Sequence, residues 1–205
     1  MFPVDFWIAA VKAGWVAPSP SLAKHVASAG PPGGPLLRTL LNGDLDVTLV
    51  LDYEHLYASL LYYVAREQDD LSLLRDIIAR VPCKKLDPEL LRVVVSERAD
   101  GGTEMLAMLL DHGLNINYRK KERISLRDQY DPWAGDAWYQ RSLTALHMAA
   151  KRGNKTAVSF LISRGAKLNE PEFYGDTARD LALRAGHHEI VEILDQAAKP
   201  RDHKY

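Results

Sequence analysis

Apolar residues recur along this chain at the spacing of helices. In the segment 155–163 they stand at Ala157, Val158, Leu161 and Ile162, which is one face of a helix. The segments 58–66 and 71–80 are predicted to form another pair of helices. The apolar positions Leu90, Leu91, Val93, Val94 and Val95 are predicted to be the core of a further helix between Pro88 and Ala99. The pattern therefore predicts an all-α fold of short helices.

The helices repeat with a fixed period near the carboxyl end. Four kinds of residue recur 33 positions apart, namely Thr144 and Thr177, Gly153 and Gly186, Val158 and Val191, and Leu161 and Leu194. A period of this size is typical of stacked repeats, each too small to bury its own apolar faces. The threonine suits the cap of a first helix, and the glycine suits its end, where a positive φ is usually needed. Each unit is therefore predicted to be a pair of helices.

The repeated residues resemble the ankyrin repeat. The segment 144–150, Thr-Ala-Leu-His-Met-Ala-Ala, is similar to the T-P-L-H-x-A-A signature, with alanine where proline is usual. The segment 186–191, Gly-His-His-Glu-Ile-Val, is similar to the start of the family's second helix. The segment 165–169, Gly-Ala-Lys-Leu-Asn, is similar to the closing G-A-D-V-N. The resemblance implies an ankyrin-repeat solenoid of helix-turn-helix units.

The same frame extends toward the amino terminus with weaker matches. The spacing of 101–117 follows that of 153–169. We expect one array over residues 1–199, of five to six units, and a short tail at 200–205. The expected repeats are 6–30, 33–52, 56–82, 88–117, 140–169 and 173–197. An alternative for the first 55 residues or so is a separate helical cap.

One long insertion interrupts the array. Asn117 and Thr144 are 27 positions apart, whereas the equivalent Asn169 and Thr177 are eight apart. We expect the segment 118–139 to be an inserted finger, because insertions between repeats lie in loops, often on the binding side. Its first half is basic, its second half is acidic, and it holds Trp133 and Trp138. Aromatic residues and arginine are typical of interaction hot spots. The alternative is that both tryptophans fold back onto the array.

Composition and charge exclude several classes of partner. The formal net charge is -1, from 26 basic and 27 acidic residues. That balance argues against nucleic acid or an anionic membrane as the partner. There is one cysteine, Cys83, so no disulfide can form within the chain. A cytoplasmic or nuclear location is therefore expected, and no apolar stretch reaches the roughly 20 residues of a membrane-spanning helix.

The histidines are expected to be structural. Adjacent His187 and His188 point about 100° apart on a helix and do not converge on one metal ion. His147 lies in the resembled signature, which implies a hydrogen bond to the backbone of the hairpin region. No glycine motif for phosphate binding is present. We expect no metal, no cofactor, no small-molecule substrate and no catalytic site.

A protein-binding module is the function these observations favour. The expected contact residues come from the inserted finger and from the positions where ankyrin repeats vary. They are Arg119, Lys120, Arg123, Tyr130, Trp133, Trp138, Gln140, Arg141, Leu143, Lys151, Arg152, Phe173, Tyr174, Asp176 and Arg184. We expect a monomer that binds another protein. The alternatives are a subunit that associates with itself and an enzyme built on a repeat scaffold.

Overall fold

The described part of the chain is helical. The computed structural model describes residues 4–14, 16–17, 22–23, 26, 34–42, 71–97, 102–119, 143–172 and 174–199, and these contain no strand. The all-α prediction is thereby confirmed. The described residues group into two compact units, one of residues 1–93 with 104–114 and one of residues 94–103 with 115–205. None of the described helices is both long and apolar enough to cross a bilayer.

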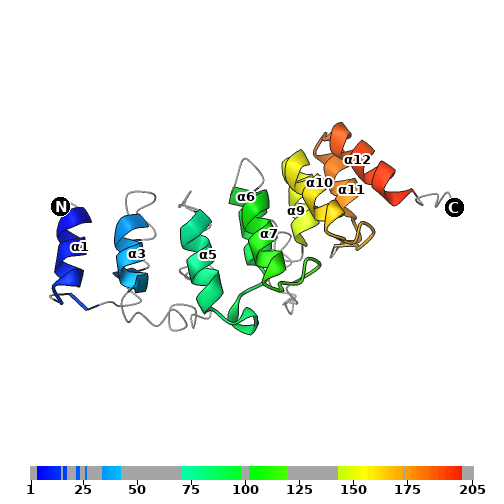
Figure 1. The fold of residues 1–205 in the computed structure, drawn as a ribbon. Helices are drawn as coiled ribbons and strands as arrows, with labels where there is room; N and C mark the ends of the chain where they lie inside the picture. Colours follow the sequence, from blue (N-terminus) through cyan, green and yellow to red (C-terminus); the bar gives the residue numbers. More distant parts are fainter. Residues whose placement is uncertain are drawn as a thin grey trace, which may run out of the picture. The chain divides into compact units, whose positions relative to one another are not determined.

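The first unit holds single helices and short connections. Its described elements are α1 (Val4–Lys12), α3 (Gly34–Asn42), α5 (Leu71–Arg80), the 3-10 helix η3 (Cys83–Lys85), the start of α6 (Leu90–Glu97) and most of α7 (Thr103–Asp111). Helix α3 packs against α1 and against α5 (Figure 1). The bounds of α5 are those that the apolar spacing predicts.

Hydrogen bonds join the elements of the first unit. Arg38 of α3 donates to Ser72 and to Asp76 of α5, the latter at 3.3 Å. His112, which follows α7, makes a 2.7 Å contact from Nε2 to the carbonyl oxygen of Val81. Leu73, Leu74, Ile77, Leu90, Met105 and Leu106 are fully buried. The apolar face that the sequence pattern identifies is therefore the core here.

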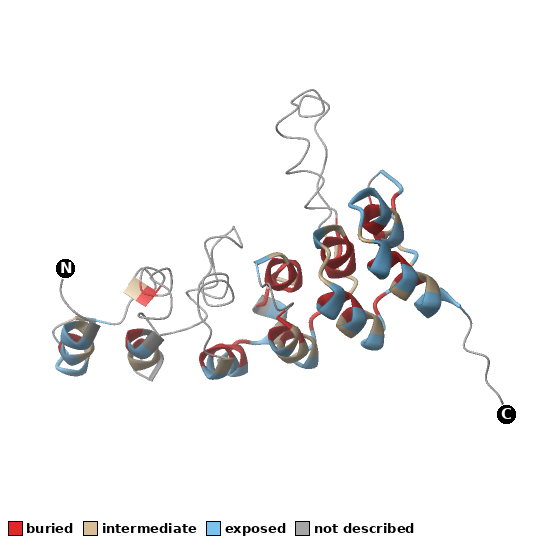
Figure 2. Ribbon diagram, turned by 90° about the horizontal axis from the view of Figure 1, so that it is seen from above, coloured by how far each residue is buried: buried red, intermediate tan, exposed pale blue. Residues whose placement is uncertain are grey.

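The second unit contains two complete helix pairs. Its helices are α9 (Ala145–Arg152), α10 (Lys155–Ser163), α11 (Ala178–Arg184) and α12 (His188–Ala198). Helix α9 packs against α11 and α10, and α12 packs against α11 and α10, so the pairs form two layers of two helices (Figure 1). Figure 2 shows the buried residues on the faces that these helices turn to each other. Ala149, Ala157, Ala178 and Ala182 are 0% exposed, which permits this close approach.

Equivalent backbone hydrogen bonds recur 33 residues apart. Met148 N–H donates to Thr144 O and Leu181 N–H to Thr177 O, both at 3.1 Å. Past the helix ends, Asn154 N–H donates to Ala149 O, and 33 positions on, His187 N–H donates to Ala182 O. Gly153 and Gly186 both have positive φ, 77° and 78°. The two pairs therefore share one backbone geometry.

The weaker match of 101–117 to 153–169 also has a structural counterpart. Leu114 N–H donates to Leu109 O at 3.2 Å, as Ala166 N–H donates to Leu161 O at 3.0 Å. Gly113 and Gly165 end these helices with φ of 106° and 84°. The number of repeats and the single array over 1–199 stay predictions. The tail 200–205 and all of 118–139 beyond residue 119 lie outside the described residues.

Candidate functional site

The turn between α10 and α11, at residues 171–177, is held by hydrogen bonds within the turn. Glu172 N–H donates to Asp176 O at 2.7 Å, and Gly175 N–H donates to Glu172 O at 3.0 Å. Glu172 Oε1 accepts the N–H groups of Tyr174 at 2.8 Å and Asp176 at 3.2 Å. The Glu172 side chain is only 3% exposed. The buried Glu172 carboxylate therefore stabilises the turn.

One side chain of this turn, Asp176, contacts the end of α11. The carboxylate of Asp176, 9% exposed, accepts two bonds from the Arg184 guanidinium, at 2.5 and 2.6 Å. Such a bidentate pair fixes the plane of the guanidinium. The Tyr174 ring is 60% exposed, and Arg184 is 65% exposed. The turn thus exposes the Tyr174 ring, and its Asp176 positions the exposed Arg184 at the end of α11.

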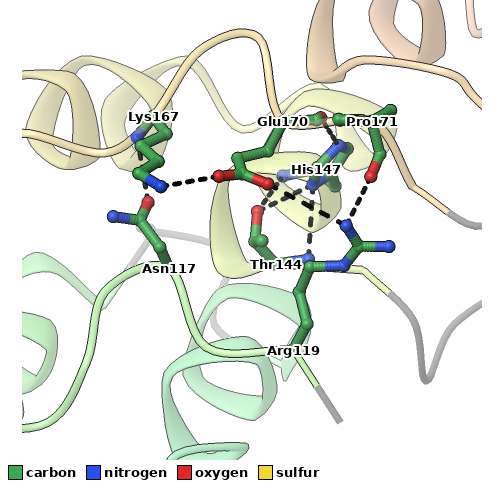
Figure 3. Close-up of polar contacts among 7 residues, drawn as sticks. All are labelled: Asn117, Arg119, Thr144, His147, Lys167, Glu170 and Pro171. Carbon is green, nitrogen blue, oxygen red and sulfur yellow. Dashed lines mark hydrogen bonds and ion pairs between the residues drawn. The ribbon is translucent and has the colours of Figure 1, made fainter. Parts of the chain in front are cut away.

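His147, on the first helix of one pair, bonds the segment that leads to the next pair (Figure 3). Its Nδ1 accepts the N–H of Thr144 at 3.3 Å, and Thr144 Oγ1 lies 2.7 Å from the same nitrogen. Since Nδ1 accepts, Nε2 carries the ring proton and donates to Glu170 O at 2.9 Å. This bond to the hairpin backbone is the one that the ankyrin resemblance implies.

The His147 ring is held neutral. Burial, at 1% exposure, lowers its pKa below the ordinary value, and the nearby Arg119 lowers it further, against the bonding to backbone carbonyls. A protonated ring would also lose the acceptor for the Thr144 N–H. A neutral ring with both nitrogens bonded has neither a free lone pair nor an accessible proton. The structural role predicted for this histidine therefore fits better than acid-base work.

The segment after α7 is tied to the same region. Arg119 donates to Pro171 O at 2.6 Å and lies 4.0 Å from the Glu170 carboxylate. Asn117 Oδ1 accepts the N–H of Lys167 at 2.9 Å (Figure 3). A hydrogen bond from Lys167 lowers the pKa of Glu170, and Arg119 adds to that effect. Arg119 therefore binds the residues at the start of the turn.

The end of α9 is covered by a histidine of the following pair. His187 Nε2 donates to Lys151 O at 3.2 Å. A Cβ on Gly153 would lie 2.6 Å from His187 Cε1, so the glycine makes room for the ring. The absence of a side chain at Gly153 therefore permits this contact.

The structure places the predicted contact residues in different environments. Leu143 is 2% exposed, so the structure corrects its prediction as a contact residue, because it packs in the core. Arg152, Tyr174 and Arg184 are exposed, Lys151 is half-buried, and Asp176 is buried beside Arg184. Arg119 is half-buried at the start of the turn 171–177. Eight predicted contact residues lie outside the described residues, namely Lys120, Arg123, Tyr130, Trp133, Trp138, Gln140, Arg141 and Phe173.

Glu172 is a residue of this site that the sequence pattern did not predict. Its position three residues before Gly175 was the available signal, because an acidic residue can cap the N–H groups of a following turn. No group of three metal-ligating side chains occurs within the ranges described above.

Comparison with known proteins finds similarity to ankyrin repeats in the carboxy-terminal part. Residues 126–202 match the sequence profile of ankyrin repeats, three copies. The human ARF GTPase-activating protein GIT1 is 28% identical over 121 residues, which is 57% of this chain and 14% of that protein. The mouse and rat proteins of that name match at the same identity, over 13% of their length. The chain thus spans a small part of these relatives, and its residues 126–202 are similar to ankyrin repeats.

Proposed function

We propose that this chain is a non-catalytic adaptor that binds another protein through the turn 171–177 and the carboxyl ends of α9 and α11. Ankyrin repeats are in general protein-interaction modules, which is the coarse basis of the proposal. The observation that carries it is the turn itself. Tyr174 is exposed while the Glu172 carboxylate bonds the backbone beneath it. A surface that is already ordered incurs little entropy cost on binding.

The inserted finger belongs to the same proposal on sequence grounds. Trp133 and Trp138, with Tyr130, Gln140, Arg141 and Phe173, remain predicted contact residues, as do Arg119, Lys120 and Arg123. A large aromatic content in a long insertion supports binding, because such residues dominate interface energetics. The single free thiol, Cys83, supports an intracellular location.

Affinity purification with the full chain tests the proposal. The variant Tyr174→Ala with Arg152→Ala removes exposed side chains and leaves the core unchanged. The matched control is Arg75→Ala, because Arg75 is an exposed arginine on α5. We expect proteins that wild type and control retain and that the double variant loses. A third arm, lacking residues 120–136, asks whether the finger contributes. If no captured protein depends on either region, the proposal fails.

A further inference from the structure

The two helix pairs of the second unit differ on one face of their first helices. In α9, Leu146 is 1% exposed and Ala150 is 0% exposed. In α11, the positions 33 residues later hold Arg179, whose side chain is 44% exposed, and Leu183, which is 48% exposed. Residues four apart lie on the same face of a helix. One face of α11 is therefore open where the same face of α9 is covered.

The following helix pair is what covers this face of α9. The two pairs share one backbone geometry, and α9 packs against α11. Positions that are buried without a following pair should be buried in both helices, as Ala149 and Ala182 are, both at 0% exposure. Positions buried in α9 alone are those that the following pair covers. A helix pair stacked on α11 in the same way would therefore contact Arg179 and Leu183.

An ion pair bridges α11 and α12 at this open face. Arg179 donates from Nε to Asp195 Oδ1 at 2.6 Å and from Nη2 to Asp195 Oδ2 at 3.0 Å. These hydrogen bonds lower the pKa of Asp195 and raise the pKa of Arg179, so both groups are charged at neutral pH. In the preceding pair, the same two positions hold Leu146 and Ile162. The pair α11–α12 thus carries charges where the pair α9–α10 carries apolar side chains.

We infer that the face formed by Arg179, Leu183 and Asp195, the end face, keeps a further helix pair or a second copy of this chain from stacking on α11 and α12. A helix pair stacked there would take the two charges out of water, which is costly. Terminal units of stacked arrays need a polar outer face to remain soluble. An exposed ion pair adds little to stability, so its position on this face points to that role.

The end face determines which kind of association the chain avoids. If the end of one copy packed on the start of the next, the contact would repeat without closing and form a filament. The charged pair opposes such head-to-tail growth, and a single exposed leucine beside it is ordinary for a protein surface. None of the three residues of the end face is among the contact residues predicted above, so the end face and the proposed function can fail separately.

An extended chain tests whether a helix pair can stack on the end face. A second copy of residues 167–199 is inserted directly after residue 199, in register with the 33-residue period. In a companion chain, Arg179→Leu, Leu183→Ala and Asp195→Ile give the end face the residues of α9 and α10. We expect the added copy to stack only in the companion chain, because its contact face is apolar only there. Each extended chain is compared with the same chain without the copy.

Limited proteolysis and urea denaturation report whether the copy stacks. We expect trypsin to remove the copy from the extended wild-type chain, whose urea midpoint should match that of wild type. In the companion chain the copy should resist trypsin, and the urea midpoint should rise. Stacking of the copy on the wild-type end face overturns the inference, whether or not the companion chain folds. Failure of the copy to stack on a folded companion chain also overturns it.

Light scattering with the full chain tests the end face against a second copy. Arg179→Leu with Asp195→Ile removes the ion pair, and we expect the mean mass to increase with concentration. The matched control is Lys155→Leu with Glu189→Ile, which removes another exposed ion pair, between α10 and α12, and adds the same apolar side chains. The control should have the mass of wild type at every concentration, and circular dichroism checks that both variants are folded.

Three results of the light-scattering experiment would overturn the inference. The first is an unchanged mass for Arg179→Leu with Asp195→Ile in a folded chain. The second is equal association of the control, because the effect would then come from added apolar surface anywhere on the unit. The third is self-association of wild type that Leu183→Glu abolishes, because the end face would then be a contact between copies.

Discussion

Replacing Gly153 by alanine probes the contact between consecutive repeats. The added Cβ would lie 2.6 Å from Cε1 and 2.9 Å from both nitrogens of the His187 ring. Real Cβ atoms do not approach ring atoms so closely, so the imidazole must move. Movement breaks the bond from His187 Nε2 to Lys151 O. The substitution therefore acts at the junction of α9 and α12.

Two energies contribute to the expected loss. Alanine at a positive φ costs about 1–2 kcal/mol, and Gly153 has φ of 77°. A lost hydrogen bond costs about 1 kcal/mol. We therefore expect Gly153→Ala to lower the free energy of unfolding by about 2–3 kcal/mol. Gly186 has φ of 78° and nothing within 4 Å of its Cβ position, so Gly186→Ala isolates the backbone cost of about 1–2 kcal/mol.

Urea denaturation followed by far-ultraviolet circular dichroism measures the difference. The four members of the cycle are wild type, Gly153→Ala, His187→Ala and the double variant. Once the ring is absent, the alanine should cost only its backbone strain. The reasoning is refuted if Gly153→Ala and Gly186→Ala destabilise equally, or if His187→Ala leaves the cost of Gly153→Ala unchanged.

Three further changes have expected results in the same assay. Leu161→Ala, at a fully buried position, should cost about 2–5 kcal/mol, while Leu183→Ala, 48% exposed, should cost less than about 1 kcal/mol; similar losses would contradict the assigned core. Thr177→Ala removes a helix cap and should cost about 1 kcal/mol, whereas the exposed Thr156→Ala control should cost almost nothing. Folding lowers the pKa of His147, so the unfolded chain binds more protons near pH 6 and the free energy of unfolding should fall as the pH drops below about 6.5. The difference between the urea midpoints at pH 8 and pH 5.5 should therefore be smaller in His147→Gln than in wild type.

The carboxy-terminal repeats were predictable because local chemistry determines them. Thr144 and Thr177 cap their helices in the structure, and Gly153 and Gly186 have the positive φ that the pattern indicates. Each of these residues acts on its own backbone or within three residues of it. The same holds for α5, whose apolar spacing gave its bounds.

The contact residues were less predictable because exposure depends on tertiary packing. Leu143 directly precedes Thr144, the first residue of the signature. The repeat pattern alone did not show that the Leu143 side chain is buried and the Arg152 side chain is exposed. Glu172 is buried, and its carboxylate accepts backbone N–H groups of the turn that follows it. Pairings across a repeat, such as Arg119 with Pro171, involve residues 52 positions apart, and no local pattern encodes them.

One period after His147, the equivalent position is occupied by Asp180. This difference affects how the second unit opens locally. Asp180 reaches Thr177, but a carboxylate cannot donate to a downstream carbonyl as His147 does to Glu170. His147 thus bonds both Thr144 and the Glu170 carbonyl, whereas Asp180 bonds only Thr177. In native-state hydrogen exchange, the amides of α11 and α12 should exchange through a local opening that leaves α9 protected. The last helix pair would then fray reversibly while its neighbour keeps its shape.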